Sequence, residues 1–375
     1  MTKAKDSRVG GKNMNDVKKG MSRRSVLKGG AVLGAAAAVN MPFIRPSYAG
    51  SSLKVSTFGG YFEQSFSSFI YPAFTKATGI AVESVPQSES PAFLIQLQQA
   101  SKAGAVPMDI CCMPQSELLR GRELKLWKTY DLGKIPNASL LPDRYVNKIP
   151  SGVDGVGAMA WYTTFVVNKE TVKPLPDSWK ALWDPKYKNS WGLQSGGVSN
   201  IIEITSMVWF GTNDLLNSKE GIDKVIAKIA ELKPNVKLWW EEEGTMQTAL
   251  ENDDVLGGTY YNDVAHTMAG NGTPVVSLFP KEGGVVDFGS WAQLDVSKKI
   301  AEAQAFINYT CTAEAQELMA RHVGSVPLID RAKMNLTQAE FDNVSSDVPP
   351  ILVASEARLK NQSYMDQAFT KMLAG

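Results

Sequence analysis

Short apolar runs alternate with helical patterns between residues 53 and 113, and this alternation limits the folds open to the chain. Leu53–Phe58 (LKVSTF) has the polar and apolar alternation of a strand, and a helical pattern follows it. Ile80–Val85 and Met108–Met113 predict two further strands, with a second helix beginning at Ser90-Pro91 between them. A strand, helix, strand, helix, strand order at this spacing indicates a parallel α/β sheet.

The chain is too long for one ordinary hydrophobic core. Its 375 residues predict two domains. A long β-rich run at Val156–Asn168 is typical of a crossover between lobes, and a second α/β set extends from there to Phe279. We therefore predict an α/β fold of two lobes, each a mostly parallel sheet flanked by helices. The cleft between the lobes is where a ligand is expected to bind.

The N-terminal segment has the pattern of a twin-arginine export signal. Arg23 and Arg24 lie in SRRSVLK, the apolar stretch Gly29–Val39 follows, and Ser47-Tyr48-Ala49 is a small-x-small cleavage site. A membrane anchor is the alternative, but this apolar stretch is far shorter than the ~20 residues that span a bilayer. We predict export by the twin-arginine route, cleavage near Ala49 and a periplasmic mature protein.

The formal net charge of +1 conceals two parts of opposite sign. Residues 1–49 hold ten Lys and Arg against two Asp, while the remainder holds 29 basic and 36 acidic residues. A basic leader on an acidic body argues against nucleic acid as a partner of the folded part. Because residues 1–20 are polar and basic, Met21 stays open as an alternative start to Met1.

Catalytic and metal-binding patterns are scarce. His266 and His322 have no acidic or cysteine partner at zinc-ligand spacing, and we identified no nucleophile-elbow or phosphate-loop motif. We interpret Glu241–Glu243 as a solvated face. Adjacent Cys111 and Cys112 lie in an apolar run and are interpreted as small buried residues, although a disulfide between them stays open. We predict no cofactor and no enzymatic activity; the alternative is an exported periplasmic enzyme whose cofactor is not evident in the sequence.

Aromatic side chains are the main positive signal for ligand binding. Several stand where a predicted strand meets a loop, where a flat ring can cover an apolar ligand surface and donate a hydrogen bond. Core packing is the alternative for each ring, and we predict it for Trp179, Trp183 and Trp209. The candidate wall residues are Tyr61, Trp161, Tyr162, Tyr260 and Tyr261.

The segment Asp177–Lys188 (DSWKALWDPKYK) resembles the periplasmic solute-binding proteins of ATP-driven importers, specifically the spermidine/putrescine-binding group. Phe74–Ile80 (FTKATGI), Leu232–Val236 (LKPNV) and Pro280–Gly284 (PKEGG) agree with that group in order. The resemblance covers nearly all of residues 53–375. It implies a type II periplasmic binding fold, closure of two lobes around a small ligand, and docking of a monomer onto the membrane permease of an ABC importer.

The resemblance and the crossover pattern together predict the domain limits. Residues 1–49 form the signal segment with its basic extension. Residues 50–158 and about 288–345 form a discontinuous first lobe, and residues 159–287 form the second lobe. Residues from about 346 to 375 form a C-terminal helical segment that packs on the lobes.

The sequence departs from the polyamine binders where they hold ammonium groups. Gln194-Ser195-Gly196-Gly197 stands where the family has two acidic residues, and Asp287 and Gly289 stand where it has tryptophan and aspartate. An ammonium group buried without an anion costs several kcal/mol, which argues against a linear polyamine held in the family's way. Asp263 and Asp287 can hold one cationic group of a smaller amine or amino-acid-like compound. Equally, Gln194–Gly197 can supply amides to an anion.

The candidate ligand-binding residues come from both predicted lobes. One lobe contributes the segment after the first strand and the other the segment after Tyr260, with Asp287 on the returning crossover strand. The full set is Gly60, Tyr61, Gln115, Trp161, Tyr162, Ser195, Gly196, Tyr260, Tyr261, Asp263 and Asp287.

Overall fold

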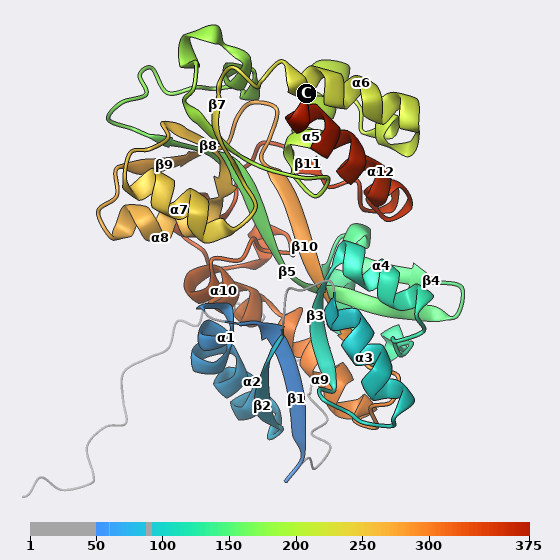
Figure 1. Ribbon diagram of the computed structural model, residues 1–375. Coiled ribbons are helices and arrows are strands. Elements are labelled where there is room, and N and C mark those ends of the chain that lie inside the picture. The colour runs from blue at the N-terminus through green and yellow to red at the C-terminus, as the bar shows by residue number, and fades with distance from the viewer. Residues whose placement is uncertain (1–49, 60, 88–91) are drawn as a thin grey trace, which may run out of the picture. The chain divides into compact units, whose positions relative to one another are not determined.

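The computed structural model describes residues 50–59, 61–87 and 92–375, and its strands join in one continuous sheet of eleven (Figure 1). The predicted signal residues Arg23, Arg24 and Ala49 lie outside the described residues. The main path of the sheet runs through β2 (Ala81–Gln87), β1 (Ser52–Phe58), β3 (Ile110–Pro114), β10 (Val285–Gln293), β5 (Gly152–Asn168), β8 (Gly257–Tyr261), β6 (Trp191–Gln194) and β7 (Val236–Trp240). The strands beside this path are β4 (Val146–Ile149), β9 (Val275–Leu278) and β11 (Ile351–Leu352).

The sheet is parallel at its two ends and antiparallel in its middle. Strand β1 pairs parallel with β2 and β3, and β6 pairs parallel with β7 and β8. Between these groups, β10 runs antiparallel to both β3 and β5, and β5 runs antiparallel to β8. We call the elements around β1–β3 the first lobe and those around β6–β8 the second lobe. The predicted limits at residues 158 and 287 fall inside β5 and β10 and stay a prediction.

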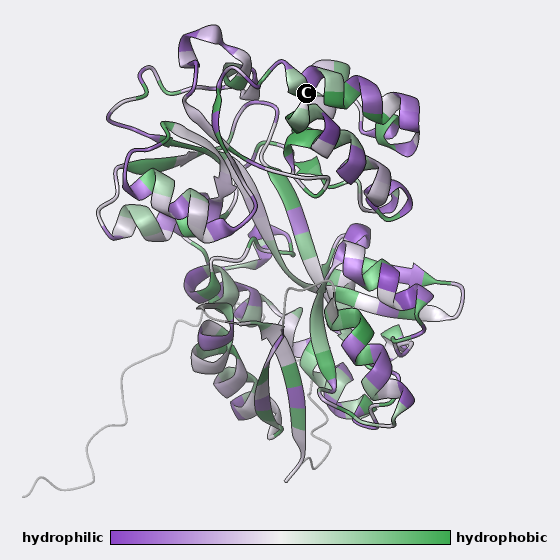
Figure 2. Ribbon diagram, in the orientation of Figure 1, coloured by the Kyte–Doolittle hydropathy of each residue, from purple (hydrophilic) through white to green (hydrophobic). Residues whose placement is uncertain are grey.

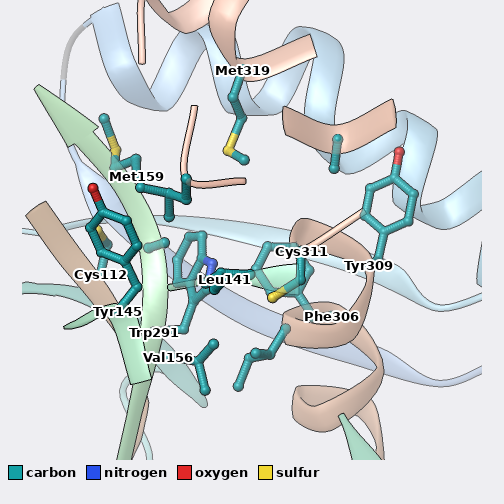
Figure 3. Packing of buried hydrophobic residues seen from close by; sticks show 14 of the residues in the cluster. Cys112, Leu141, Tyr145, Val156, Met159, Trp291, Phe306, Tyr309, Cys311 and Met319 are labelled. Carbon is teal, nitrogen blue, oxygen red and sulfur yellow. The ribbon is translucent and has the colours of Figure 1, made fainter. Parts of the chain in front are cut away.

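Aromatic packing holds the first lobe together (Figure 3). Phe306 lies edge-on to Trp291 and to Phe74, with ring centroids 5.0 and 5.1 Å apart. Gly79, in the left-handed region at φ 82°, ends the helix that carries Phe74, as the glycine in this position of the sequence suggests. The helices of this lobe are α1 (Tyr61–Ser65), α2 (Tyr71–Thr78), α3 (Ala92–Lys102), α4 (Gln115–Glu123), α9 (Ile300–Thr310) and α10 (Ala313–Val323).

A second core lies under the helices of the other lobe. Trp191 packs edge-on to Phe165 at 5.2 Å, and Trp179 stacks on Phe165 at 5.5 Å. The C-terminal helix packs into the same core through Phe369, whose ring meets Trp239 at 5.5 Å. The helices are α5 (Ile201–Thr205), α6 (Lys219–Ala230), α7 (Glu243–Glu251), α8 (Asn262–Gly270), α11 (Gln338–Val344) and α12 (Ser355–Ala374).

Short π-helical and 3₁₀-helical segments lie between these elements. Two are π-helical and directly extend α1 and α5, while the others are 3₁₀ turns in connecting segments. The π segments are η1 (Phe66–Ile70) and η7 (Ser206–Phe210). The 3₁₀ segments are η2 (Leu132–Lys134), η3 (Pro136–Leu140), η4 (Asp143–Tyr145), η5 (Trp179–Trp183), η6 (Pro185–Tyr187), η8 (Asp214–Asn217) and η9 (Arg331–Lys333).

Trp209 is the one ring among the three predicted core tryptophans that the structure places at the surface. Trp179 is fully buried, but 38% of Trp209 is exposed, so the core prediction for Trp209 is wrong. The ring lies near the end of η7, and the ammonium of Lys228 lies 3.8 Å from its centroid. A cation over the face of an indole stabilises a ring that remains exposed to solvent. The sequence pattern does not distinguish such an exposed ring from a buried one.

The three cysteines, Cys111, Cys112 and Cys311, are buried and free. Cys111 and Cys112 therefore serve as small core residues, as the apolar run around them predicts. Helices such as α2 and α6 carry both hydrophobic and hydrophilic residues along their length (Figure 2). Among the described residues, no helix combines the length and the hydrophobicity that crossing a membrane requires.

The aromatic core of the first lobe gives a direct test of the packing. Replacing Phe306 with Ala is expected to lower the free energy of unfolding by about 3–5 kcal/mol, because it leaves a cavity between Trp291 and Phe74. Phe210, which is 40% exposed, provides the matched control, since its replacement with Ala is expected to cost no more than about 0.5 kcal/mol. Urea denaturation followed by tryptophan fluorescence measures both; equal losses would contradict the packing described here.

Candidate functional site

A cavity of about 280 Å³ lies between the two lobes, against β5. The first lobe supplies its wall from β1, β2, β3, α1, α3 and α4, and the second lobe from α7, β8 and α8. Five aromatic residues line it: Phe58, Phe62, Phe93, Trp161 and Tyr261. Its charged residues are Glu117, Arg120, Glu243 and Asp263, and the others are Gln87, Leu94, Met113, Pro114 and Val264.

The aromatic wall is built around Phe58, the last residue of β1. Its ring lies edge-on to Trp161 of β5, with centroids 6.2 Å apart and planes at 89°. Phe62 of α1 approaches the other side of Phe58, also at 6.2 Å. Edge-on contacts leave ring faces available to other partners, and such faces attract both apolar chains and cationic groups.

The pairing of β5 with β10 explains the aspartate that interrupts an apolar strand. Asp287 stands directly opposite Trp161 in the antiparallel register. Cross-strand partners point to the same face of a sheet, so the carboxylate of Asp287 and the indole of Trp161 lie side by side on the face that borders the cavity. Tyr261 stands opposite Thr163, two residues along β5, and therefore belongs to the same face.

Asp287 lies in a partly buried and strongly polar environment. Its Oδ1 accepts a hydrogen bond of 2.8 Å from the backbone N–H of Phe288. Burial raises the pKa of Asp287 to about 6; the hydrogen bond from Phe288 and the charge of Arg358 act against this rise, and Glu117 adds to it. The carboxylate is thus mostly ionised at neutral pH, but the protein stabilises its charge less well than water does.

Asp263 stands in the first turn of α8, at the opposite side of the cavity. The backbone N–H of Val264 donates to its carboxylate, yet burial is the larger effect and raises the pKa of Asp263 to about 6. Gly324 ends α10 at φ 77°, and a Cβ there would lie 2.9 Å from the Cβ of Asp263. Only glycine therefore lets the end of a first-lobe helix approach Asp263 so closely.

A buried ion pair supports the face that carries Asp287. Arg358 of α12 donates from Nε to Glu203 of α5 at 2.7 Å, and both side chains are almost fully buried. Its guanidinium also donates to Oδ1 of Asn200 at 3.2 Å, and Asn200 in turn donates to Oγ1 of Thr163 at 2.8 Å. The chain of contacts ties the C-terminal helix to the strand that carries Trp161.

Of the residues predicted from the sequence, the structure brings three to this cavity: Trp161, Tyr261 and Asp263. Asp287 does not line the cavity but is the cross-strand neighbour of Trp161. Gly60 lies outside the described residues, and Tyr61 begins α1 with its side chain outside them as well.

The other predicted residues lie elsewhere. Gln115 donates from its side chain to Asn147. Tyr162 faces the opposite side of β5, edge-on to Phe279 at 4.9 Å, and Tyr260 is fully buried with its hydroxyl donating to a backbone oxygen at 3.1 Å. Ser195 and Gly196 follow β6 and lie outside the cavity lining. The backbone N–H of Ser195 donates to the carbonyl of Trp240, and Gly196 has a φ of 83°.

Sequence reasoning missed the charged residues of α4 and undervalued Glu243. Glu117 and Arg120 are one helical turn apart on the helix that follows β3, so the spacing of the sequence could have placed them together. Glu243 is exposed, as predicted for a solvated acidic run, and nevertheless lines the cavity. A single exposed residue carries no pattern that reveals which surface it faces.

A ligand-sized cavity between two α/β lobes is a common place for a small molecule to bind. The chain belongs to the family of bacterial extracellular solute-binding proteins, whose model matches residues 70–342. A twin-arginine translocation signal matches residues 20–39. The protein is therefore an extracellular solute-binding protein of the ABC transporter class, exported to the periplasm by the twin-arginine route.

The curated relatives of this chain are named for two kinds of ligand. The gamma-aminobutyric acid-binding protein of Pseudomonas aeruginosa is 22% identical over 282 residues, which are 74% of this chain and 77% of the relative. The spermidine/putrescine-binding periplasmic protein of Salmonella typhimurium is 24% identical over 310 residues, 80% of this chain and 87% of the relative. The sequence-based recognition of this group is confirmed, and the alternative of an exported enzyme has no support among these relatives.

Solved structures confirm the predicted fold class of two-lobed type II binding proteins. An ABC transporter substrate-binding protein from Bradyrhizobium japonicum superposes with a TM-score of 0.73 at 20% identity, covering 86% of this chain and 99% of that one. A spermidine/putrescine ABC transporter substrate-binding protein from Streptococcus pneumoniae gives a TM-score of 0.69 at 19% identity, again covering 86% and 99%.

The raised pKa of Asp287 leads to a prediction about stability. A folded-state pKa above the ordinary value means that ionisation of Asp287 destabilises the fold, so the contribution of this residue to stability is fully present below its ordinary pKa and is lost as the pH rises through about 6. Replacing Asp287 with Asn is expected to raise the free energy of unfolding at pH 7.5 by about 1–2 kcal/mol. Urea denaturation at pH 7.5 and pH 5 measures the gain, which should shrink at pH 5; a less stable variant at pH 7.5 would refute this account.

Proposed function

We propose that the protein captures a small amine-containing solute in the cavity between its lobes and delivers it to the membrane permease of an ABC importer. The observation that carries this proposal is the composition of the cavity wall, where three carboxylates and five aromatic rings stand against one guanidinium. An excess of negative charge beside aromatic faces favours a cation with an apolar body.

The charged side chains of the cavity wall indicate the sign of the ligand's charge. Glu117, Glu243 and Asp263 give the cavity three acidic groups against Arg120. An ammonium group that leaves water needs such partners, because a buried unpaired charge costs several kcal/mol and one cation–π contact returns only ~0.5–2. An anion held by the amides of Gln194–Gly197 is disfavoured, because Ser195 and Gly196 lie outside the cavity lining.

The two-lobe origin of the wall supports a closure mechanism. A ligand in the cavity touches Phe58 and Glu117 of the first lobe and Tyr261 and Asp263 of the second. It therefore gains contacts in the closed arrangement that an open arrangement lacks, and this difference in affinity shifts the population toward closure. The strands β5 and β10 connect the lobes and are the segments where a hinge is expected.

Both ligand types named for the relatives are amines. This chain lacks acidic residues at the positions where the polyamine binders have them. In their place, α4, α7 and α8 supply acidic side chains to the cavity from other positions. Those side chains leave one or two cationic groups possible, as in gamma-aminobutyric acid or putrescine. We further propose that the protein acts as a monomer, without a cofactor, enzymatic activity or nucleic-acid partner.

Ligand-induced stabilisation tests the proposed function. A compound that binds the folded protein raises its stability by ~2.7 kcal/mol at about a hundredfold excess over Kd. Thermal shift measurements over polyamines, amino acids, organic acids and thiamine-like cations are expected to give a rise with at least one amine. No shift with any compound, together with a measurable hydrolytic activity, would refute the proposal.

The two aspartates predict how amine binding depends on substitution and on pH. Replacing Asp263 or Asp287 with Asn is expected to weaken a cationic ligand by more than about tenfold, because each change removes an anion from the cavity or its border. Both carboxylates take up protons below about pH 6, so affinity for the cation is expected to fall between pH 7.5 and pH 5.

Isothermal titration calorimetry of the wild type and both variants measures these effects. His266, on the exposed face of α8, supplies a control substitution to Ala that should leave affinity unchanged. Unchanged affinity in Asp287→Asn would exclude that residue from the site, and unchanged affinity in both aspartate variants would contradict the cationic ligand.

A further inference from the structure

Arg120 differs from every other arginine among the residues that the structure describes. Its side chain makes no ion pair or hydrogen bond within that part of the chain, although it is half-buried in the cavity wall. The others have partners: Arg122 pairs with Asp154, Arg321 with Glu340, and Arg358 with Glu203. Arg144 and Arg331 each donate at least one hydrogen bond from the side chain.

The contrast with Arg122 shows that a lack of nearby acidic residues does not explain why Arg120 has no ion pair among the described residues. Two residues further along α4, Arg122 makes a two-pronged contact with Asp154, at 2.6 and 2.9 Å. Arg120 has Glu117 one helical turn before it, a spacing at which opposite charges usually meet. These two side chains do not come within ion-pair distance, and both line the cavity instead.

The cavity therefore has separated charges of opposite sign. Arg120 and Glu117 stand on α4 of the first lobe, while Glu243 and Asp263 approach from α7 and α8 of the second lobe. A guanidinium in a partly dry wall repels an ammonium group and favours a carboxylate or another planar anion, which it can hold through two parallel hydrogen bonds. A ligand with an amine alone uses the acids but leaves this group unmatched.

We infer that the ligand is dipolar: an amine that also bears a carboxylate, received by Arg120, while its ammonium group meets the acids of the second lobe. This inference rests on the proposed amine-binding function and assigns Arg120 as the residue that separates amino acids from plain amines. Linear diamines, with a second cation in place of the carboxylate, are disfavoured by the same group. The aromatic rings around Phe58 cover the carbon chain between the two charges.

Two ligand pairs that differ by the acid group test the inference. Calorimetry with 4-aminobutanoate and butylamine, and with phenylalanine and phenethylamine, is expected to show that the acid-bearing member of the pair that fits binds at least about tenfold more tightly. Putrescine, with a second amine, is expected to bind less tightly than 4-aminobutanoate.

Substitution then assigns the effect to one side chain. Arg120→Gln is expected to reduce that preference to less than about twofold without weakening the binding of the plain amine, and Arg120→Lys to retain part of it. Arg331→Gln removes a charge outside the cavity lining and should leave the affinity for every ligand unchanged. Glu117→Gln is expected to weaken both members of the pair. Circular dichroism confirms that each variant is folded.

The outcomes separate the inference from the proposed function. Equal or tighter binding of the plain amines or putrescine to the wild type would overturn the inference and leave amine capture standing. A preference for the acid-bearing ligand that survives Arg120→Gln would overturn the role of Arg120. No binding of any of these compounds would overturn the inference, and would overturn the proposed function too if no other amine raises the melting temperature.

Discussion

The antiparallel pairing of β5 with β10 is the interaction on which the rest of the structure depends. These two strands connect the parallel groups at the ends of the sheet, so both cores are joined through their hydrogen bonds. The same register sets Asp287 opposite Trp161. A slip of β10 by one residue would turn Asp287 away from Trp161 to the other face of the sheet, where Tyr162 packs against Phe279. The join between the lobes and the chemistry of the cavity border are thus fixed together.

The proposed binding face carries charges that cost stability. Asp263 and Asp287 both keep carboxylates where burial raises their pKa to about 6, and the buried guanidinium of Arg358 needs its contacts with Glu203 and neighbouring oxygens. Buried charges of this kind add little net stability. Their retention is understandable if a ligand completes the balance, because a cation between the lobes stabilises the ionised aspartates and the closed arrangement at once.

Sequence patterns predicted the fold better than the site, for physical reasons. Alternation and helix caps identify elements such as Leu53–Phe58 because burial acts along a single strand or helix. Trp161, Tyr261 and Asp263 could also be predicted from the sequence, since each stands on or just after a strand that faces the cleft. Glu117 and Arg120 could not be predicted in this way, because their place in the cavity wall depends on the second lobe that lies opposite them. The exposure of Trp209 likewise depends on Lys228, a neighbour distant in the sequence.

The ion pair of Arg358 with Glu203 also has a consequence for biogenesis. Arg358 lies in α12, the last helix of the chain, while Glu203 lies near the middle and is completely buried. Until α12 has left the ribosome, Glu203 has no guanidinium to balance it, and the second core lacks Phe369. A twin-arginine substrate folds before it crosses the membrane. A chain that ends before α12 is therefore expected to reach the export machinery incompletely folded, because both the ion pair and this part of the second core are missing from it.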